Sequence, residues 1–377
     1  MKRVAIVTTI GALSWGGSEE LWKNLSHELL ANEYQVFGSV FNWVTEPKPL
    51  TELRDKGAII HKRKRFQYNS LKGKIKGFIN RKWFGLKQLS EIKKFNPDFV
   101  FFSCGGAFDT STFPYNDFIF SLNCPFGIYL SLNTEFEVLP FEIMKIQKQV
   151  FEKAKFVIFP SKRNLDTAKR QICSNISNGI VLNNPITFND ISPLTLPESN
   201  TIKFASVARL DAFVKGQGVL LEIFSNEKWR VRDFELNIFG SGDDLNYLKE
   251  LTKFYRLEGK VKFKGHVKDI REDIWADNHV LLMPSQYEGC PISLYDAAIC
   301  SRPAVVSDVG GNAEFVENGV NGIVAEAPSV LSFGNALETM WENRGNIKLF
   351  GENSRKKALS TLNLKPHIAV MKEIENY

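Results

Sequence analysis

The sequence predicts an α/β fold made of two doubly wound domains, each a parallel sheet with helices on both faces. Three observations support this prediction. Short apolar runs rich in Val, Ile and Phe alternate with longer amphipathic stretches along the chain. Such continuously apolar strands are typical of parallel sheets that are buried on both faces. The alternation occurs twice, on either side of Asn189–Asn200, a polar stretch with two prolines that we expect to be a linker.

The predicted elements follow in chain order. Strands of the first half are predicted at Val4–Thr9, Gln35–Phe41, Asp98–Ser103, Gly127–Leu132, Phe156–Phe159 and Gly179–Leu182. Strands of the second half are predicted at Ile202–Val207, Glu235–Phe239, Val261–Lys264, Val280–Met283, Ala304–Ser307 and Gly322–Ala325. Helical spacing occurs between them, as at Glu19–Leu30, Phe141–Ala154, Leu245–Arg256 and Ile292–Ile299. Residues 1–190 and 200–355 are thus two predicted Rossmann-like domains, and a final helix at about 360–377 is a candidate to pack back onto the first.

Composition excludes several classes of protein. The 377 residues are 44% hydrophobic and 24% charged, which are ordinary globular values. We find no apolar run near the roughly 18 residues that span a bilayer, and Val4–Leu13 is interpreted as a buried first strand instead of a secretory signal. The five cysteines are odd in number and include no CxxC, which argues against a disulfide framework and a zinc site. We therefore expect a cytoplasmic protein with reduced thiols.

Positive charge is concentrated in one segment. Lys62–Lys94 contains twelve Lys or Arg and a single acid, Glu91, whereas the whole chain carries only +6. Within residues 61–95 the bases are interleaved with Phe66, Tyr68, Phe78, Trp83 and Phe84. A solvated loop and helix would explain this pattern, as would docking on an anionic membrane surface at the inner face of the membrane. Binding of nucleic acid is disfavoured, because the motifs elsewhere in the chain are unrelated to it.

Two acids follow a predicted strand at residues 280–283. Glu288 is expected in the loop at the carboxyl end of this strand, and Asp296 about a turn or more inside the next helix, which Pro291 begins. Carboxylates accept hydrogen bonds from sugar and ribose hydroxyls, so this pair can line a sugar-binding pocket. A capping acid plus a solvated acid would explain the same two residues.

Glycines and cations accompany these acids. Gly310 and Gly311 stand between a strand and a helix, where exposed N–H groups suit a diphosphate. Arg209 and Lys215 follow the first strand of the second half and can neutralise that diphosphate as its charge grows during bond cleavage. Near the start of the chain, Gly16 and Gly17 are expected to leave N–H groups free at a helix N-terminus.

Together these motifs resemble the family 4 glycosyltransferases, retaining enzymes of the GT-B fold, in which two Rossmann-like domains face a central cleft. The resemblance covers most of the chain and is strongest at residues 206–325. It consists of ARL and KGQ within 208–217, FGSG at 239–242, VKFKGHV at 261–267, PSQYEGCP at 284–291, SRPAVVSDVGGNAEFV at 301–316 and NGVNGIV at 318–324. GGSEE at 16–20 also fits.

The resemblance implies roles for the matching residues. Arg209 and Lys215 would bind the donor diphosphate, and Glu288, the first acid of the E-x7-E motif, would contact the transferred sugar. Asp296 stands where the second acid holds the ribose, but it is one methylene shorter, so that contact is expected to be longer or water-mediated. The other implied donor-binding residues are Gly16, Gly17, Gly240, His266, Val267, Ser285, Gly289, Cys290, Pro291 and Ile292.

A second departure from the family concerns the acceptor. Residues 97–106, where family members often carry a histidine, contain none. Where many members have a His-bearing acceptor loop, residues 131–135 read SLNTE, and Asn133 and Glu135 are the candidate acceptor-side residues. By the resemblance, residues 1–190 would bind a glycan or lipid-linked acceptor and residues 200–355 the nucleotide diphosphate sugar. The implied reaction is a front-face displacement in which the departing phosphate oxygen takes the acceptor proton, without metal or cofactor.

The sequence thus predicts a retaining glycosyltransferase, in cell-surface polysaccharide or glycoconjugate biosynthesis. The alternatives are a GT-B nucleotide-sugar epimerase, a phosphorylase, or a module that binds a sugar nucleotide without turnover. The base, the sugar, the acceptor, the linkage and the oligomeric state carry no signal in the sequence.

Overall fold

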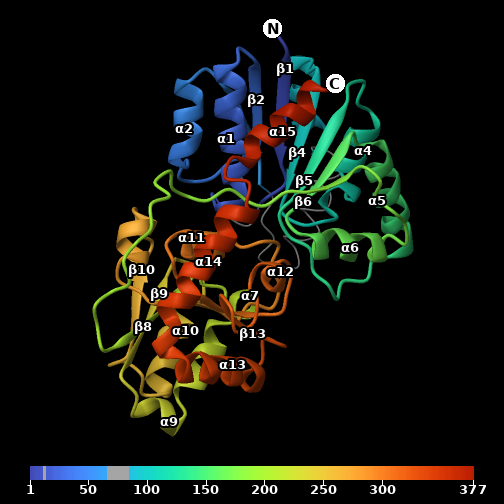
Figure 1. Ribbon diagram of the computed structural model, residues 1–377. Helices are drawn as coiled ribbons and strands as arrows, with labels where there is room; N and C mark the ends of the chain where they lie inside the picture. The colour runs from blue at the N-terminus through green and yellow to red at the C-terminus, as the bar shows by residue number, and fades with distance from the viewer. Residues whose placement is uncertain (12–13, 66–84) are drawn as a thin grey trace. The chain divides into compact units, whose positions relative to one another are not determined.

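The structure is a computed structural model that describes residues 1–11, 14–65 and 85–377. The chain divides into two compact units, Met1–Pro185 with Asn363–Tyr377, and Ile186–Leu362. Each unit is an open parallel sheet with helices on both faces (Figure 1), which confirms the predicted α/β fold of two Rossmann-like domains. The observed division after Pro185 lies just before the predicted linker, which therefore belongs to the second unit.

The sheet of the first unit has seven parallel strands in the order β3-β2-β1-β4-β5-β6-β7. The strands are β1 (Arg3–Thr8), β2 (Gln35–Phe41), β3 (Ile59–Arg63), β4 (Phe99–Cys104), β5 (Phe126–Leu130), β6 (Phe156–Phe159) and β7 (Gly179–Val181). The central strands β4, β5 and β6 are buried at every position. Their continuous apolar pattern is the one expected for strands covered on both faces.

Helices cover both faces of this sheet. They are α1 (Gly17–Ala31), α2 (Lys48–Asp55), α4 (Tyr115–Phe120), α5 (Phe141–Lys153), α6 (Lys162–Gln171) and α15 (Pro366–Glu375), with a 3-10 turn η1 (Asp109–Ser111) and helical residues at 85–95. One face is covered by α1, α2 and α15. The other is covered by α4, α5, α6 and residues 85–95.

The chain returns to the first unit at its C-terminal end. The Asn183 side chain donates to the Asn363 carbonyl and accepts from its N–H, at 2.9 and 2.8 Å. These two bonds join the point where the chain leaves the unit to the point where it re-enters. Beyond them, α15 packs along α1 (Figure 1) and buries Val370, Met371 and Ile374.

The sheet of the second unit has six parallel strands in the order β10-β9-β8-β11-β12-β13. The strands are β8 (Ile202–Val207), β9 (Phe234–Phe239), β10 (Val261–Gly265), β11 (Val280–Met283), β12 (Ala304–Ser307) and β13 (Gly322–Ala325). The helices are α7 (Ala212–Lys215), α8 (Gln217–Phe224), α9 (Glu227–Arg230), α10 (Leu245–Phe254), α11 (Ile292–Ile299), α12 (Asn312–Phe315), α13 (Val330–Glu342) and α14 (Ile347–Thr361), with a π-helical turn η2 (Arg271–Trp275) and a 3-10 turn η3 (Arg344–Asn346). One apolar core joins α8, α10 and α13 to the sheet.

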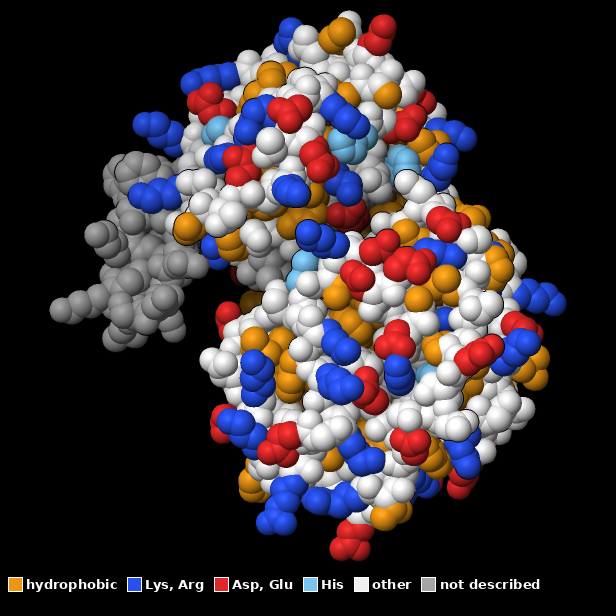
Figure 2. Space-filling model, turned by 90° about the vertical axis from the view of Figure 1, so that its left-hand side faces the viewer, with side chains coloured by type: hydrophobic (Ala, Val, Ile, Leu, Met, Phe, Trp, Pro, Cys, Tyr) orange, Lys and Arg blue, Asp and Glu red, His pale blue; other side chains and the backbone are white. Residues whose placement is uncertain are grey.

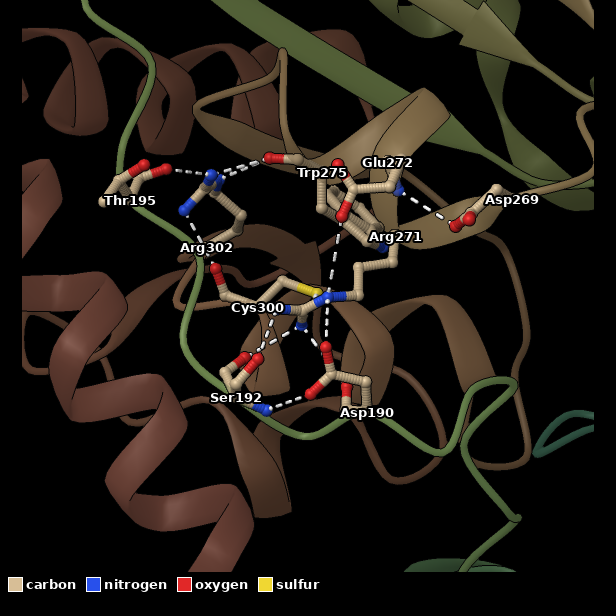
Figure 3. Close-up of polar contacts among 9 residues, drawn as sticks. All are labelled: Asp190, Ser192, Thr195, Asp269, Arg271, Glu272, Trp275, Cys300 and Arg302. Atoms are coloured by element: carbon tan, nitrogen blue, oxygen red, sulfur yellow. Dashed lines mark hydrogen bonds and ion pairs between the residues drawn. The ribbon is translucent and has the colours of Figure 1, made fainter.

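The predicted linker has no helix or strand, yet it is held firmly to the second unit (Figure 3). Arg302, which is 1% exposed, donates to the carbonyls of Leu194 and Thr195 in the linker. Arg271 donates to the carbonyl and hydroxyl of Ser192, both at 2.8 Å. Composition therefore predicted the irregular backbone correctly but gave no sign of this attachment.

The basic segment at residues 61–95 lies partly outside the described residues, as do Phe66, Tyr68, Phe78, Trp83 and Phe84. Of its described bases, Lys62 is paired with Glu46 and Lys94 with Glu91. On the face shown in Figure 2, basic and acidic side chains are interspersed over the described surface. Among the described helices, none combines the length and apolarity that crossing a membrane requires. Docking of this segment on an anionic membrane surface stays a prediction.

Candidate active site

The candidate active site lies at the carboxyl edge of the second sheet, where the strand order reverses. β8 and β11 are neighbours in the sheet although β9 and β10 lie between them in sequence. Ligands of open parallel sheets bind at such a reversal, because the loops that leave the two strands diverge there. The loop after β8 carries Arg209 and leads to Lys215, and the loop after β11 carries Glu288. The topology thus gathers three of the predicted site residues at one sheet edge.

Two glycines allow these loops to approach each other closely. Gly216 has a φ of +67°, and a Cβ there would lie 2.1 Å from the carbonyl oxygen of Pro284. Gly310, in the loop after β12, has a φ of +51°, and its Cβ would lie 2.0 Å from the carbonyl oxygen of Glu288. Residues other than glycine rarely adopt such a φ, and these distances exclude any side chain. Both glycines therefore hold the loop that positions Glu288.

Lys215 and Glu288 form an ion pair, with 2.6 Å between Nζ and Oε1. The Glu288 side chain is 7% exposed and that of Lys215 is 20% exposed, so the pair is largely shielded from water. The backbone aligns the two loops, because the Gln286 N–H donates to the Val214 carbonyl at 2.9 Å. An ammonium group has three protons, so Lys215 can bind this carboxylate and a further anion together.

Arg209 is held by residues that the sequence did not single out. Its guanidinium lies 2.8 Å from the carboxylate of Asp211, and its carbonyl accepts from the Gln217 side chain at 2.8 Å. Asp211 also caps α7 by accepting from the Val214 N–H. An Asp directly before a short helical stretch is an N-cap signal, and it would have identified Asp211. Arg209 remains partly exposed and can reach an anion at the sheet edge.

Asp296 lies on α11 and is 1% exposed. Its two carboxylate oxygens accept from the Thr187 N–H at 3.0 Å and from the Thr187 hydroxyl at 2.8 Å. The acid therefore anchors the first residues of the second unit to α11. This contact was not foreseen, since Thr187 is more than a hundred positions away in sequence. The ribose contact implied by the resemblance stays a prediction.

The loop from Ser285 to Ile292 is tied to the loop after β12. The Ser285 carbonyl accepts from the Ser307 hydroxyl, and the Gly289 carbonyl accepts from the Gly311 N–H at 2.8 Å. Pro291 precedes the first turn of α11, where Ile292 follows it. The resemblance also implies that residues 289–291 supply backbone N–H groups to the sugar and phosphate. Pro291 has no N–H, so this role can hold only for Gly289 and Cys290.

Cys290 is 4% exposed and contacts the hydroxyl of Tyr295. Burial raises the pKa of the Cys290 thiol to about 12. A thiol with this pKa is protonated at neutral pH and is a poor nucleophile. The side chain of Cys290 therefore packs within the loop, and none of the five cysteines is in a disulfide.

Gly240, His266 and Val267 follow β9 and β10 on the same edge of the sheet. Gly240 approaches the Ala208 carbonyl so closely that a Cβ would lie 2.0 Å from it, and its N–H donates to Gly265. His266 is exposed and Val267 is half-buried. The predicted place of these two residues beside a nucleotide base stays a prediction.

In the first unit, the expectation for Gly16 was wrong. Its N–H is not free at the start of α1, because it donates to the Glu19 side chain at 3.0 Å. Glu19 also accepts from the Ser18 hydroxyl, and it is 4% exposed. The Glu at the third helical position is a capping signal that the sequence contained. Gly17 is the first residue of α1 and is exposed.

Glu19 makes stability depend on pH. Burial raises its pKa to about 7, from an ordinary value of 4.5. The folded state therefore binds this proton more tightly than the unfolded state does, so stability falls as the pH rises from about 4.5 to about 7. We expect the unfolding free energy of Glu19→Gln, relative to that of the native protein, to rise by roughly 2–3 kcal/mol between pH 4.5 and pH 8. Urea denaturation across this range measures the difference.

The matched control for this prediction is Glu52→Gln, which changes an exposed acid of the same unit. Its unfolding free energy should follow the native protein at every pH. If the unfolding free energies of Glu19→Gln and the native protein differ by the same amount across the pH range, the assignment of a raised pKa to Glu19 is contradicted.

The two acceptor-side candidates lie after β5. Asn133 is 3% exposed, and its amide donates to the Asn164 carbonyl at 3.4 Å. Glu135 forms an ion pair with Arg163 of α6, with 2.7 Å between the Glu135 carboxylate and Nε of Arg163. Both side chains thus contribute to the packing of this loop on α6, and their predicted acceptor role stays untested.

Within residues 1–11, 14–65 and 85–377, no three His, Cys, Asp or Glu side chains gather as metal ligands would. The expectation that the transfer reaction proceeds without a metal remains a prediction. The groups that the candidate site does supply are the cations Arg209 and Lys215 and the acid Glu288.

The residues of this site lie within a region that matches a known protein family. Residues 189–357 match the family model "Glycosyl transferases group 1". The chain is 28% identical over 168 residues to an uncharacterized glycosyltransferase of Haemophilus influenzae. This match covers 44% of the chain and 46% of the relative. It is 25% identical over 179 residues to the UDP-Gal:alpha-D-GlcNAc-diphosphoundecaprenol alpha-1,3-galactosyltransferase of Escherichia coli. This match covers 47% of the chain and 42% of the relative. The matches span less than half the length of these relatives.

The fold extends the likeness over the whole chain. The crystal structure of Anabaena HepE in complex with UDP and glucose matches with a TM-score of 0.76, covering 100% of both chains at 15% identity. At this identity the likeness establishes the GT-B fold alone.

Proposed function

Residues 189–357 match the family model of the glycosyl transferases group 1, and the chain has the GT-B fold. On this basis we propose that the protein moves a sugar from a nucleotide diphosphate sugar to an acceptor hydroxyl with retention of configuration. The ion pair of Lys215 with Glu288, beside Arg209 at the strand reversal, is the observation that carries the proposal. An acid and two cations at one sheet edge support the binding of sugar hydroxyls and of a diphosphate there.

The proposed chemistry follows from the charges of these groups. The bond between the anomeric carbon and the phosphate oxygen breaks, and negative charge grows on the departing diphosphate. Arg209 and Lys215 stabilise that charge because they are fixed before the reaction begins. The acceptor oxygen bonds to the anomeric carbon from the same face, and its proton passes to the departing phosphate oxygen. Glu288 accepts a hydrogen bond from a hydroxyl of the transferred sugar and orients the ring.

The two units take different substrates in this proposal. The second unit binds the donor, and the first binds a glycan or lipid-linked acceptor, in the synthesis of a cell-surface polysaccharide or glycoconjugate. The Escherichia coli relative is named for a lipid-linked diphosphate acceptor, and the HepE structure contains UDP, which supports these substrate classes. UDP sugars are therefore the first donors to test.

Ligand binding tests the proposal most directly. We expect UDP or another nucleoside diphosphate to raise the melting temperature, because a ligand at one hundred times its Kd adds about 2.7 kcal/mol to the stability of the folded state. The matching nucleoside is the control, since it lacks the diphosphate that Arg209 and Lys215 would bind. A melting temperature unchanged by every nucleoside diphosphate and its sugars would contradict the proposal.

Product analysis with the donor so identified separates the alternatives. Transfer requires an acceptor, an epimerase changes the donor without one, and a phosphorylase requires inorganic phosphate. Binding of the donor without any product would support the alternative of a module that holds a sugar nucleotide without turnover.

A further inference from the structure

A cavity in the first unit lies apart from every predicted site residue. Its volume is about 240 Å³, and Thr9, Phe41, Arg63, Asp109 and Tyr115 are among the residues that line it. Thr9, Phe41 and Arg63 stand at the carboxyl ends of β1, β2 and β3, the edge at which parallel sheets bind ligands. The space suits a group smaller than a typical drug-sized ligand, such as one sugar ring.

Arg63 is the unusual residue of this cavity. It is 3% exposed, and within the part of the chain that the structure describes it donates only to uncharged oxygens. These are the Tyr115 hydroxyl at 2.8 Å, the Ser39 carbonyl at 3.3 Å and the Thr8 carbonyl. Its Nε atom is buried and has no hydrogen-bond partner among the described residues. Buried charges are ordinarily paired with an opposite charge, so this cation calls for an anion.

Two aromatic rings hold the guanidinium in place. Its central carbon lies 4.4 Å from the ring centre of Phe41 and 5.6 Å from that of Tyr115. Such contacts compensate part of the lost hydration and fix the orientation of the group, but they do not neutralise its charge. A neutral amide could donate to the same carbonyls without burying a charge. The carbonyl contacts alone therefore do not account for an arginine here.

The acid in the cavity wall is already bound elsewhere. Asp109 accepts from the Thr9 hydroxyl at 2.5 Å and from the N–H groups of Gly105 and Gly106 at 3.2 and 3.0 Å. All three bonds go to Oδ2, and among the described residues no ion pair joins Asp109 to Arg63. At the mouth of the cavity, the exposed Lys64 adds a second positive charge.

We propose that this cavity binds an anionic group, a phosphate or a carboxylate carried by a sugar, with Arg63 as its buried partner and Lys64 at its entrance. Identifying this ligand as part of the acceptor rests on the proposed function, whereas the anion site itself does not. The site would make the protein select acceptors that carry a negative charge next to the sugar ring that it recognises.

Binding of three matched probes tests the inference. Glucose, glucuronate and glucose 6-phosphate share a ring and differ in charge and in the kind of anion. We expect the native protein to bind at least one anionic probe ten times or more tightly than glucose by titration calorimetry at low ionic strength. The better anionic probe distinguishes carboxylate from phosphate. Equal affinity for all three probes would overturn the inference.

Variants locate the binding. We expect Arg63→Gln to lose the preference for the anionic probe, Arg63→Lys to retain part of it, and Lys64→Gln to reduce it. Arg54→Gln, an exposed arginine of the same unit paired with Glu46, is the matched control and should bind like the native protein. If Arg63→Gln does not fold, the binding of the three probes to the native protein and to Lys64→Gln decides whether the anion site exists. A preference that survives unchanged in every folded variant would place the anion elsewhere and overturn the inference.

A thermal shift with UDP in the same samples keeps the two proposals apart. A UDP response together with equal binding of the three probes would reject the cavity alone. An Arg63-dependent preference without any nucleotide response would reject the donor site and leave the anion site standing.

Discussion

Glu288→Gln is expected to lower the turnover of sugar transfer by about 10²- to 10³-fold. The substitution keeps the size of the side chain but removes the charge that pairs with Lys215 at 2.6 Å and that, in the proposed function, binds a sugar hydroxyl. An interaction made chiefly with the reacting sugar affects turnover more than nucleotide binding. We therefore expect the affinity for the nucleoside diphosphate to change only a few-fold. Initial rates at saturating donor, together with calorimetric titration of the nucleotide, measure both quantities.

Two comparisons make this prediction decisive. Glu342→Gln makes the same chemical change at an exposed position of α13 and should leave turnover unaltered. Replacing Glu288 also removes the ionic partner of Lys215. Because this ion pair is largely buried, the unfolding free energy of each variant must be measured. The double variant Lys215→Met, Glu288→Gln tells whether the two groups act as a unit. Native turnover in a folded Glu288→Gln variant would remove this acid from the mechanism.

Arg302→Ala should produce the largest loss of stability in the second unit. The guanidinium donates to carbonyl oxygens of Leu194, Thr195, Trp275, Asn278 and Cys300, as Figure 3 shows in part. Burial lowers the pKa of Arg302 to about 10, so the group still carries its charge at neutral pH. Removing it leaves several buried carbonyls without donors and a cavity where the side chain stood. We expect a loss of about 3–5 kcal/mol, measured by urea denaturation.

Arg344→Ala is the matched control for Arg302→Ala. Arg344 is exposed and donates only to the neighbouring Trp341 carbonyl among the described residues, so its removal should cost less than about 1 kcal/mol. Equal losses in the two variants would mean that the contacts of Arg302 with residues 194–195 do not hold this segment to the unit.

Short apolar runs in the sequence predicted most strands closely. Predictions for β2, β6, β8, β11, β12 and β13 agree with the structure at every boundary. β3 was missed because Ile59–Arg63 is a short edge strand with two basic residues, which resembles a polar loop in composition. The helix Lys48–Asp55 was missed for a similar reason, since only Leu50 and Leu53 are buried in it.

The sequence by itself determined the two parallel sheets and the loops that carry Arg209, Lys215 and Glu288, because apolar periodicity and glycine position are local properties. Only the tertiary structure decided which side chains meet. The pairing of Asp296 with Thr187, and the burial of Arg63 without an opposite charge among the described residues, depend on where the chain folds back on itself. A buried polar group must find a partner wherever the fold places one, and no local pattern records that choice.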